Sequence, residues 1–575
     1  MRRLAVSALI TCCFAQAQDP LRYRLVDAGT GAALPFAPIA YLGTGKGTIT
    51  NEEGAFQLPA APASDSLRIT YIGYATRTLA WDRLPADHIV RMRPNTRTLD
   101  ELTVEPGDEQ YARVMAAARW MNRAPLATAR LFFGMDTRSD SLPVEVLHAF
   151  YNLTTRSGHI EDLELKQGRI GITDKNGRFF INYNTTRAFA LMDPLEQRQL
   201  FPLSPLACDG TAHMRKLFVA DLISSGDGAD AVDHVRVRPR TKNKNGFTLD
   251  LWLAKDQDRV VALELTCTHC ATHPFVPLFE HGRIDSVDLR YRQTWTNEGR
   301  PMPEVIQLDY RMSYSGPGFS DDFVTHAVMH AYDRTIRFVP LLFDFAFDLP
   351  DYRKLAWLPN DTAFWQRNPP PLPSERQRYE TAFLQEHDLR TSDWSKPYGN
   401  ERDFFGSHYA LWAPDQRMVL KLVTPQNGKP FKRIQLSEWT GQYAINTAPP
   451  LVLAAQLMLD LDTVNGTLHH RSYTVLDGLR SFDHLVEQPW TMAFHNIWFD
   501  LCEMHRRALE ADLEQPWTTL AKVRQLHAYH TERMRATTDS LINSTRYGED
   551  FEALRPWNDR VRESLGIDNF VLFGL

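Results

Sequence analysis

The stretch Gly43-Thr-Gly-Lys-Gly-Thr-Ile-Thr-Asn-Glu-Glu-Gly-Ala-Phe56, followed by Leu67-Arg-Ile-Thr-Tyr-Ile-Gly-Tyr74, decides the fold of the first domain. Its first three glycines permit positive φ angles and therefore predict a loop over 42–48. The residues 51–54 have the composition of a turn. The segments that begin at Ala55 and Leu67 alternate apolar and polar residues, which is the period of half-buried β-strands.

Further alternating segments flank this stretch on both sides. Tyr23–Val26 and Ile39–Leu42 lie upstream, and His88–Arg93 lies downstream. Together these segments predict about six or seven short strands in roughly 80 residues, a strand density that is typical of a small β-sandwich.

Turn glycines and aromatic residues recur at set offsets, in Gly29-Thr-Gly31, Leu34–Pro38, Gly47–Phe56 and Tyr71–Tyr74. Over residues 21–104 this pattern resembles the carboxypeptidase-like regulatory domain. The resemblance implies a transthyretin-like β-sandwich over 18–105, which recurs at the N-termini of exported proteins of Bacteroidetes-type bacteria. It implies a module without a catalytic role, and it carries over neither a metal ligand nor a nucleophile.

Length and charge limit the class of protein. The 575 residues predict about three or four domains, and the mixture of strand and helix patterns described below predicts an α+β fold. Acidic and basic residues are interspersed at a net charge of −6, so the chain lacks the basic footprint of a nucleic-acid partner. Beyond the N-terminus no run reaches about 18 apolar residues, which predicts no transmembrane helix.

Residues 1–17 have the organisation of a secretory signal peptide. Arg2 and Arg3 are followed by an apolar core over 4–14 and by the cleavage pattern Ala15-Gln-Ala17. Lipidation at Cys12 is the alternative, although threonine precedes this cysteine where a lipoprotein signal has a small residue. We therefore expect an exported protein of the periplasm, the outer membrane or the cell surface, with peripheral outer-membrane association as one possibility.

Residues 106–358 predict a β-rich α+β domain. Apolar residues at helical spacing over 108–122 indicate an amphipathic helix, and later segments such as Phe247–Leu253 and Val305–Tyr310 alternate and are separated by hairpin turns. We expect a large, curved antiparallel sheet packed on the helix. This region also resembles the lipoprotein-carrier-like portion that follows the same N-terminal module in some outer-membrane-associated proteins. The residues 359–429 predict a linker region, in which 359–373, with Asn368-Pro-Pro-Pro-Leu-Pro373, form an extended linker and 379–389 form a short helix.

One cysteine and histidine cluster lies in the middle domain, at Cys267-Thr-His-Cys270. In an exported protein, Cys267 and Cys270 have the spacing of a short local disulfide. The alternative is a metal site formed by Cys267, His269 and Cys270, but no second ligand pair of the usual zinc spacing is evident.

The residues 430–575 predict a mostly helical domain, with long helices over 488–513 and 516–543. This domain resembles a family of bacterial zinc proteases with the signature H-E-x-x-H-F-D-x-x-E. Asp500 and Glu503 match the signature, whereas Phe494, His495 and Trp498 replace its two zinc-binding histidines and its catalytic glutamate. Because phenylalanine and tryptophan cannot bind zinc, the resemblance implies a zincin-like domain with a degenerate metal motif and no cofactor.

A polar cluster in this domain is the remaining candidate for an altered site. Its members lie in one domain and have side chains that can bind a metal ion or a proton: His469, His470, His495, Asp500 and Glu503. Alternatively, these histidines are satisfied within the core, and Glu503 forms ion pairs with Arg506 and Arg507.

The sequence thus predicts a non-catalytic binding or scaffolding role in the cell envelope, with an envelope protein or a glycan as partner. The alternatives are a metal-dependent hydrolase or peptidase with an altered site in 430–575, and a periplasmic carrier that holds apolar cargo on the middle sheet.

Overall fold

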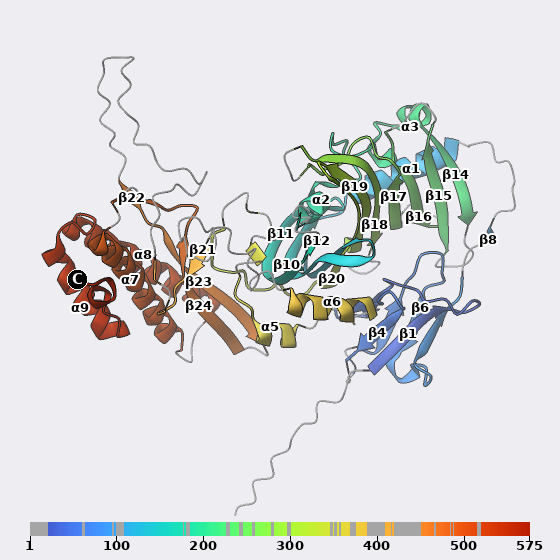
Figure 1. Ribbon diagram of the computed structural model, residues 1–575. Coiled ribbons are helices and arrows are strands. Elements are labelled where there is room, and N and C mark those ends of the chain that lie inside the picture. Colours follow the sequence, from blue (N-terminus) through green and yellow to red (C-terminus); the bar gives the residue numbers. More distant parts are fainter. Residues whose placement is uncertain are drawn as a thin grey trace, which may run out of the picture.

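The computed structural model describes most of the chain as three adjoining parts (Figure 1). The described residues are 21–59, 62, 64–94, 97–98, 108–175, 178–179, 185–225, 231–240, 245–255, 259–277, 281–295, 301–345, 349, 354–355, 358–368, 375–387, 409–415, 417–418, 450–464, 467–483, 485–486, 488–514 and 519–575. The expected signal peptide and Cys12 lie outside them. Among these residues, no helix combines the length and the apolar character that a membrane crossing requires.

The N-terminal part consists of two small sheets with an apolar core between them. One sheet has the order β4-β1-β7, with β1 Leu21–Asp27, β4 Ala55–Leu58 and β7 Ile89–Met92. The other has the order β6-β5-β2-β3, with β2 Pro38–Tyr41, β3 Lys46–Ile49, β5 Ser66–Ile69 and β6 Arg77–Ala80. A short 3-10 helix, η1, spans Trp81–Arg83.

The strand β3 shows that the loop predicted over 42–48 is too long. Gly47 pairs with Ala40 in the sheet, and a Cβ atom at position 47 would lie only 2.6 Å from the carbonyl oxygen of Ile39. The glycine therefore permits a close approach of two strands here, whereas the sequence pattern suggested that it served a turn.

The middle part is a curled half-barrel of long antiparallel strands (Figure 1). Its strands occur in the order β11-β10-β9-β20-β19-β18-β17-β16-β15-β14. Their bounds are β9 Ala127–Ser139, β10 Leu142–Arg156, β11 His159–Ile172, β14 Phe218–Ser225, β15 Val232–Pro239, β16 Thr248–Ala254, β17 Val260–Cys267, β18 Arg283–Trp295, β19 Pro303–Gly316 and β20 Phe319–Asp333. The mixed α+β fold and the large antiparallel sheet predicted from the sequence are confirmed.

Alternation along these strands separates two faces of the half-barrel. On β9, Leu131, Phe133 and Met135 point into the main core, together with apolar residues of α1 (Asp108–Asn122), α2 (Thr185–Leu191) and α3 (Thr211–Leu217). Phe132 and Asp136 point to the opposite, outer face. The remaining short elements of this part are β8 Arg97–Thr98, β12 Asp174–Lys175, β13 Arg178–Phe179 and η2 Pro205–Ala207.

The outer face is covered partly by the segment that was expected to be a linker region. It contains the helices α5 (Thr362–Arg367) and α6 (Glu375–Glu386) and the strand β21 (Tyr409–Leu411). The linker prediction is wrong at α5, because Asp361 caps this helix by accepting a hydrogen bond from the backbone N–H of Phe364 at 2.8 Å. Phe364 then packs on Phe150 of the half-barrel, which stabilises the helix in a segment rich in polar residues and prolines.

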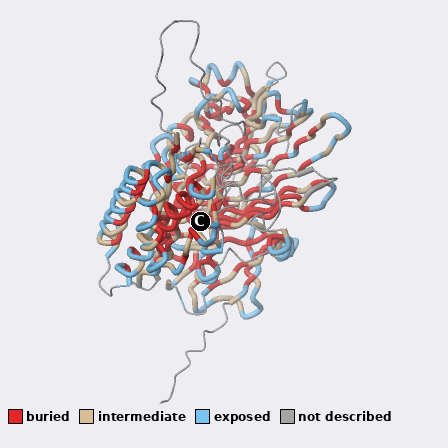
Figure 2. The backbone as a smooth tube through the Cα atoms, turned by 60° about the vertical axis from the view of Figure 1, so that its left-hand side comes forward, coloured by how far each residue is buried: buried red, intermediate tan, exposed pale blue. Residues whose placement is uncertain are grey.

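The C-terminal part combines a small sheet with four helices among the described residues. The sheet has the order β21-β24-β23, and β22 pairs with β25. The bounds are β22 Leu451–Val452, β23 Ala455–Val464, β24 Thr467–Asp477, β25 Phe482–Asp483, α7 Pro489–Leu513, α8 Leu520–Thr545, α9 Phe551–Leu565 and α10 Asn569–Phe573. The central helix α7 is deeply buried, and Figure 2 shows that the buried residues continue from the strands into the helices near the C-terminus.

A tight turn after α8 brings the chain back onto α7. Gly548 has φ +86°, and a Cβ atom there would lie 2.7 Å from the Cβ atom of Phe494. We expect Gly548→Ala to lower the free energy of unfolding by about 2–4 kcal/mol, because it adds both a left-handed backbone strain and a steric clash. The control is Gly566→Ala, since Gly566 has φ +74° but no atom within 4 Å of the added Cβ. Urea denaturation of both variants tests this, and equal losses would contradict the role of the contact with Phe494.

Candidate binding cleft

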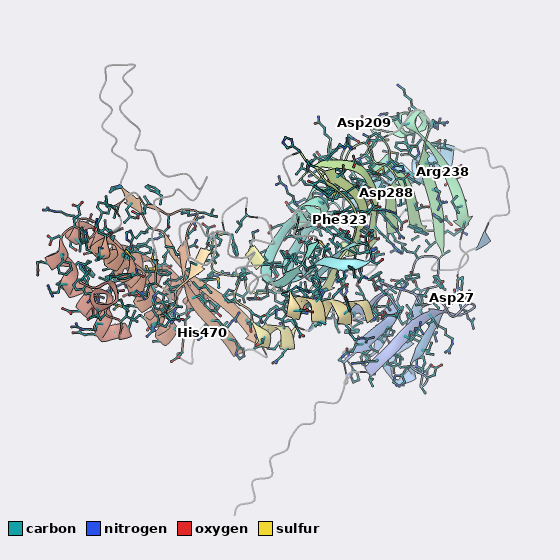
Figure 3. All side chains as sticks on the ribbon, viewed as in Figure 1. Asp27, Asp209, Arg238, Asp288, Phe323 and His470 are labelled. Atoms are coloured by element: carbon teal, nitrogen blue, oxygen red, sulfur yellow. A yellow bond between two sulfur atoms is a disulfide. The ribbon has the colours of Figure 1, made fainter. Side chains whose placement is uncertain are left out.

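The structure places the five candidate residues of the C-terminal part on two elements. His469 and His470 lie on β24, where His469 is exposed and His470 is half-buried, and Figure 3 labels His470 on this sheet. His495, Asp500 and Glu503 lie on α7 and are buried. Burial lowers the pKa of His495 to about 3, and its Nδ1 lies 2.5 Å from the carbonyl oxygen of Thr491. His495 is therefore neutral at physiological pH.

The two carboxylates of α7 are held by donors from neighbouring elements. Asp500 accepts hydrogen bonds from Trp412 Nε1 at 2.8 Å, Arg417 Nη2 at 2.6 Å and Asn569 Nδ2 at 2.8 Å. Glu503 accepts from Thr474 Oγ1 at 2.8 Å and pairs with Arg506 and Arg507.

Phe494 and Trp498, which also lie on α7, are buried in the C-terminal apolar core. The part of the chain that the structure describes holds no group of three or more residues of the histidine, cysteine and carboxylate type arranged for a metal. The geometry thus gives the polar residues of α7 a role in packing the C-terminal part.

The cysteine cluster lies at the end of β17. Cys267 and Cys270 are paired as a disulfide. The imidazole Nδ1 of His269 lies 2.9 Å from Ser286 Oγ, and its backbone N–H donates to Asp288 at 2.8 Å. His269 is thus held against β18 next to the disulfide. Cys267, His269 and Cys270 together fix the chain at the end of β17 to the neighbouring strand.

A cleft of about 250 Å³ lies where the N-terminal sandwich meets the outer face of the half-barrel. The two parts are also joined further along β20, where β3 pairs with it at Lys46 and Asp333. The sandwich and α6 supply one wall, and the strands β18, β19, β20 and β9 supply the floor. The lining residues are Pro35, Phe36, Glu52, Tyr71, Gly134, Met135, Asp136, Arg290, Arg292, Gln307, Asp309, His326, Ala327, Val328 and Glu380.

One row of side chains across the floor is balanced in charge. The strand register places Arg290, Asp309, His326 and Asp136 beside one another on four adjacent strands. His326 Nδ1 lies 3.1 Å from Asp309 Oδ1, and this hydrogen bond raises the pKa of His326. Arg290 donates to Glu264 at 2.9 Å, so the charges of this row are paired within the protein.

The neighbouring row of side chains leaves a hollow above the sheet and has an arginine at one end. The register places Arg292, Gln307, Val328 and Gly134 side by side. Gly134 has no side chain to fill the space above the sheet, and His148 follows it on β10. His148 Nε2 lies 3.6 Å from Glu380 Oε2, so the far end of this row is acidic.

Arg292 is the most distinctive group of the cleft. Burial lowers the pKa of its guanidinium, and it is hydrogen-bonded to the hydroxyl of Tyr71 from the sandwich. Its Nε is buried and has no hydrogen-bond partner among the described residues. An anionic group in the cleft would pair with the part of the Arg292 guanidinium that lines it.

Among the described residues that line the cleft there is no serine, threonine, cysteine or lysine, and the side chains that could act as nucleophiles are the carboxylates, Tyr71 and His326. Arg290 and Arg292 were not singled out from the sequence. Their only signal there is that they alternate with apolar residues on one strand, and this pattern is equally typical of a solvated face.

The fold and the cleft define a mixed α+β protein in which a β-sandwich docks on the outer face of a curled antiparallel sheet. Residues 24–104 match the family described as CarboxypepD_reg-like domain, in agreement with the resemblance found in the sequence.

Among solved structures, the chain is similar to MucB at 10% identity, over 39% of this chain and 94% of that one, with a TM-score of 0.16. It is similar to a LolA superfamily protein from Nitrosomonas europaea at 12% identity, over 39% and 94% of the two chains, with a TM-score of 0.16. For an outer membrane lipoprotein-sorting protein domain from Vibrio parahaemolyticus the identity is 9%, the coverage 40% and 95%, and the TM-score 0.18. No curated protein matches the chain.

Proposed function

We propose that this chain is a non-catalytic binding protein of the bacterial cell envelope and that the cleft between the sandwich and the half-barrel receives its ligand. The observation that carries the proposal is the half-buried side chain of Arg292, which lines a hollow of about 250 Å³ and whose Nε has no hydrogen-bond partner among the described residues. The signal-like sequence of residues 1–17 supports export.

The position of the cleft supports a binding role for the N-terminal module. Ligand sites form preferentially at domain interfaces, where side chains from separate units converge on one cavity. Here Tyr71 and Glu52 come from the sandwich, whereas Arg292 and His326 come from the half-barrel. A ligand in the cleft would contact both units and stabilise their docking.

The inner face of the half-barrel argues for a small polar ligand over apolar cargo. Apolar residues of α1 and α3, among them Tyr111, Val114 and Met214, are buried against the inner strand residues Leu251 and Leu265. Cargo on this face would have to displace those helices and expose their apolar surface. The outer cleft needs no such rearrangement.

Filling the hollow tests the proposal. We expect Gly134→Leu to weaken ligand binding by about tenfold or more, because the new side chain would occupy the floor of the cleft, where its Cβ would lie 3.3 Å from Phe132 Cε1 and 3.8 Å from Val328 Cγ1. Small anions, amino acids, peptides and glycan fragments are screened by thermal shift against the wild-type chain and against Gly134→Leu.

The matched control is Val324→Leu, which adds volume on the same outer face of β20 at a residue that does not line the cleft. Compounds that stabilise the wild type and the control but not Gly134→Leu would be ligands of the cleft. If every stabilising compound acts equally on all three proteins, the cleft is not the binding site.

A further inference from the structure

The cleft differs in charge between its two ends. Arg290 and Arg292 lie at the β18 end of the hollow, where the register places Glu264 beside Arg292 and Arg290 pairs with Glu264. Carboxylates of Glu52, Asp136 and Glu380 lie toward β9, α6 and the sandwich. The hollow crosses from β18 over β19 and β20 to β9. Since neighbouring strands are about 4.7–4.9 Å apart, its length is on the order of 14 Å.

The carboxylates of the acidic end have partners within the protein. Asp136 accepts a hydrogen bond from Arg138 at 2.9 Å and Glu380 pairs with His148. An ammonium group placed there would meet acceptors on more than one side. The same carboxylates repel a second negative charge, so a dianion such as phosphate is disfavoured at the Arg292 end.

The middle of the cleft is apolar and narrow. Val328 forms its floor beside the bare backbone of Gly134, and Pro35 and Phe36 reach it from the sandwich. Phe36 has φ 54°, an uncommon conformation for an aromatic residue and one that is concentrated at ligand sites. Small apolar side chains of a ligand fit between these groups, and large ones do not fit a cavity of this volume.

We propose that the cleft binds a short peptide as a zwitterion, with its terminal carboxylate on Arg292 and its ammonium group at the acidic end. This inference rests on the proposed binding role of the cleft. A peptide of about three residues is suited to the hollow, since an extended chain spans at most about 3.3–3.6 Å per residue. Its carboxylate would satisfy the guanidinium, and its backbone would meet Gln307 and Tyr71.

The test uses isothermal titration of the full chain with four probes: trialanine, trialanine amide, N-acetyl-trialanine and inorganic phosphate. We expect trialanine to bind and the amide to bind about tenfold or more weakly, because it lacks the charge-assisted bond to Arg292. The N-acetyl peptide is expected to bind more weakly than trialanine because it lacks the ammonium group. Phosphate at equal concentration is expected not to compete.

Variants locate the carboxylate end. Arg292→Met is expected to abolish the difference between trialanine and its amide, whereas Arg311→Met keeps it. Arg311 is the matched control because it lies on the same outer face, pairs with Asp322 at 2.6 Å and does not line the cleft. Arg292→Lys retains the charge and is expected to restore part of the preference for the free carboxylate. Circular dichroism of each variant verifies its fold.

The outcomes separate this inference from the proposed function. Equal binding of trialanine and its amide by the wild type, or displacement of trialanine by phosphate, would overturn the peptide assignment even if Arg292→Met fails to fold. If trialanine does not bind but another compound stabilises the wild type and not Gly134→Leu, the peptide assignment is wrong and the cleft remains the binding site. If no compound distinguishes these two proteins, both proposals fail.

Discussion

Replacing Lys166 with methionine is expected to lower the free energy of unfolding by about 3–5 kcal/mol. Lys166 is fully buried between the half-barrel and the C-terminal part, and its ammonium group donates to Asp460 Oδ1 and to the carbonyl oxygen of Leu461, both at 2.5 Å, and to that of Val339 at 3.0 Å. Methionine fills the same volume but removes the lysine from the buried carboxylate of Asp460, which keeps only Arg471 and Gln167, both at 3.2 Å. The penalty therefore comes from a lost buried ion pair and from two carbonyl oxygens that lose their donor, and not from a cavity.

Lys46→Met is the matched control, since Lys46 also joins two parts of the protein through an ion pair, with Asp333 at 3.9 Å. Its side chain is 53% exposed, so the expected loss is at most about 1 kcal/mol. Urea denaturation followed by tryptophan fluorescence measures both variants. A Lys166→Met protein as stable as Lys46→Met would show that the junction with the C-terminal part does not depend on this ion pair.

Replacing Asp500 with asparagine is the second change with a large expected effect, a loss of about 3 kcal/mol. The carboxylate is fully buried and accepts from Trp412 and Arg417, which lie five positions apart, and from Asn569 on α10. An amide of the same shape removes the charge that balances Arg417. It also places an NH₂ donor beside groups that are themselves hydrogen-bond donors. The substitution therefore weakens the tertiary contact between α7, α10 and the chain around Arg417.

Asp512→Asn on the same helix is the control, because Asp512 is 53% exposed and pairs with His530 at 2.9 Å. Bound metals in the wild type and in both variants are measured by mass spectrometry. We expect stability, and not metal content, to distinguish Asp500→Asn from the others. One metal per wild-type chain that is lost with Asp500→Asn would contradict the packing role and would indicate an altered metal site in the C-terminal part.

Local patterns were sufficient for much of the secondary structure. The predicted helix over 108–122 matches α1, and the predicted helices over 488–513 and 516–543 correspond to α7 and α8. Apolar periodicity succeeds at these places because each helix buries one stripe or is buried throughout. It failed at α5, where burial of Phe364 against Phe150 outweighs a composition typical of a linker, and at Gly47, where the need for glycine arises from a neighbouring strand.

The sequence by itself determined the mixed α+β class, most strands of the sandwich and the antiparallel pairing of the middle sheet, because these follow from residues close in the chain. Only the tertiary structure decided where charges meet. Tyr71 and Arg292 share a hydrogen bond although more than two hundred positions separate them, and Lys166 meets Asp460 across a similar interval. An arginine on the polar face of a strand has the same local pattern in solvent and in a cleft, so its function depends on which distant segment covers it.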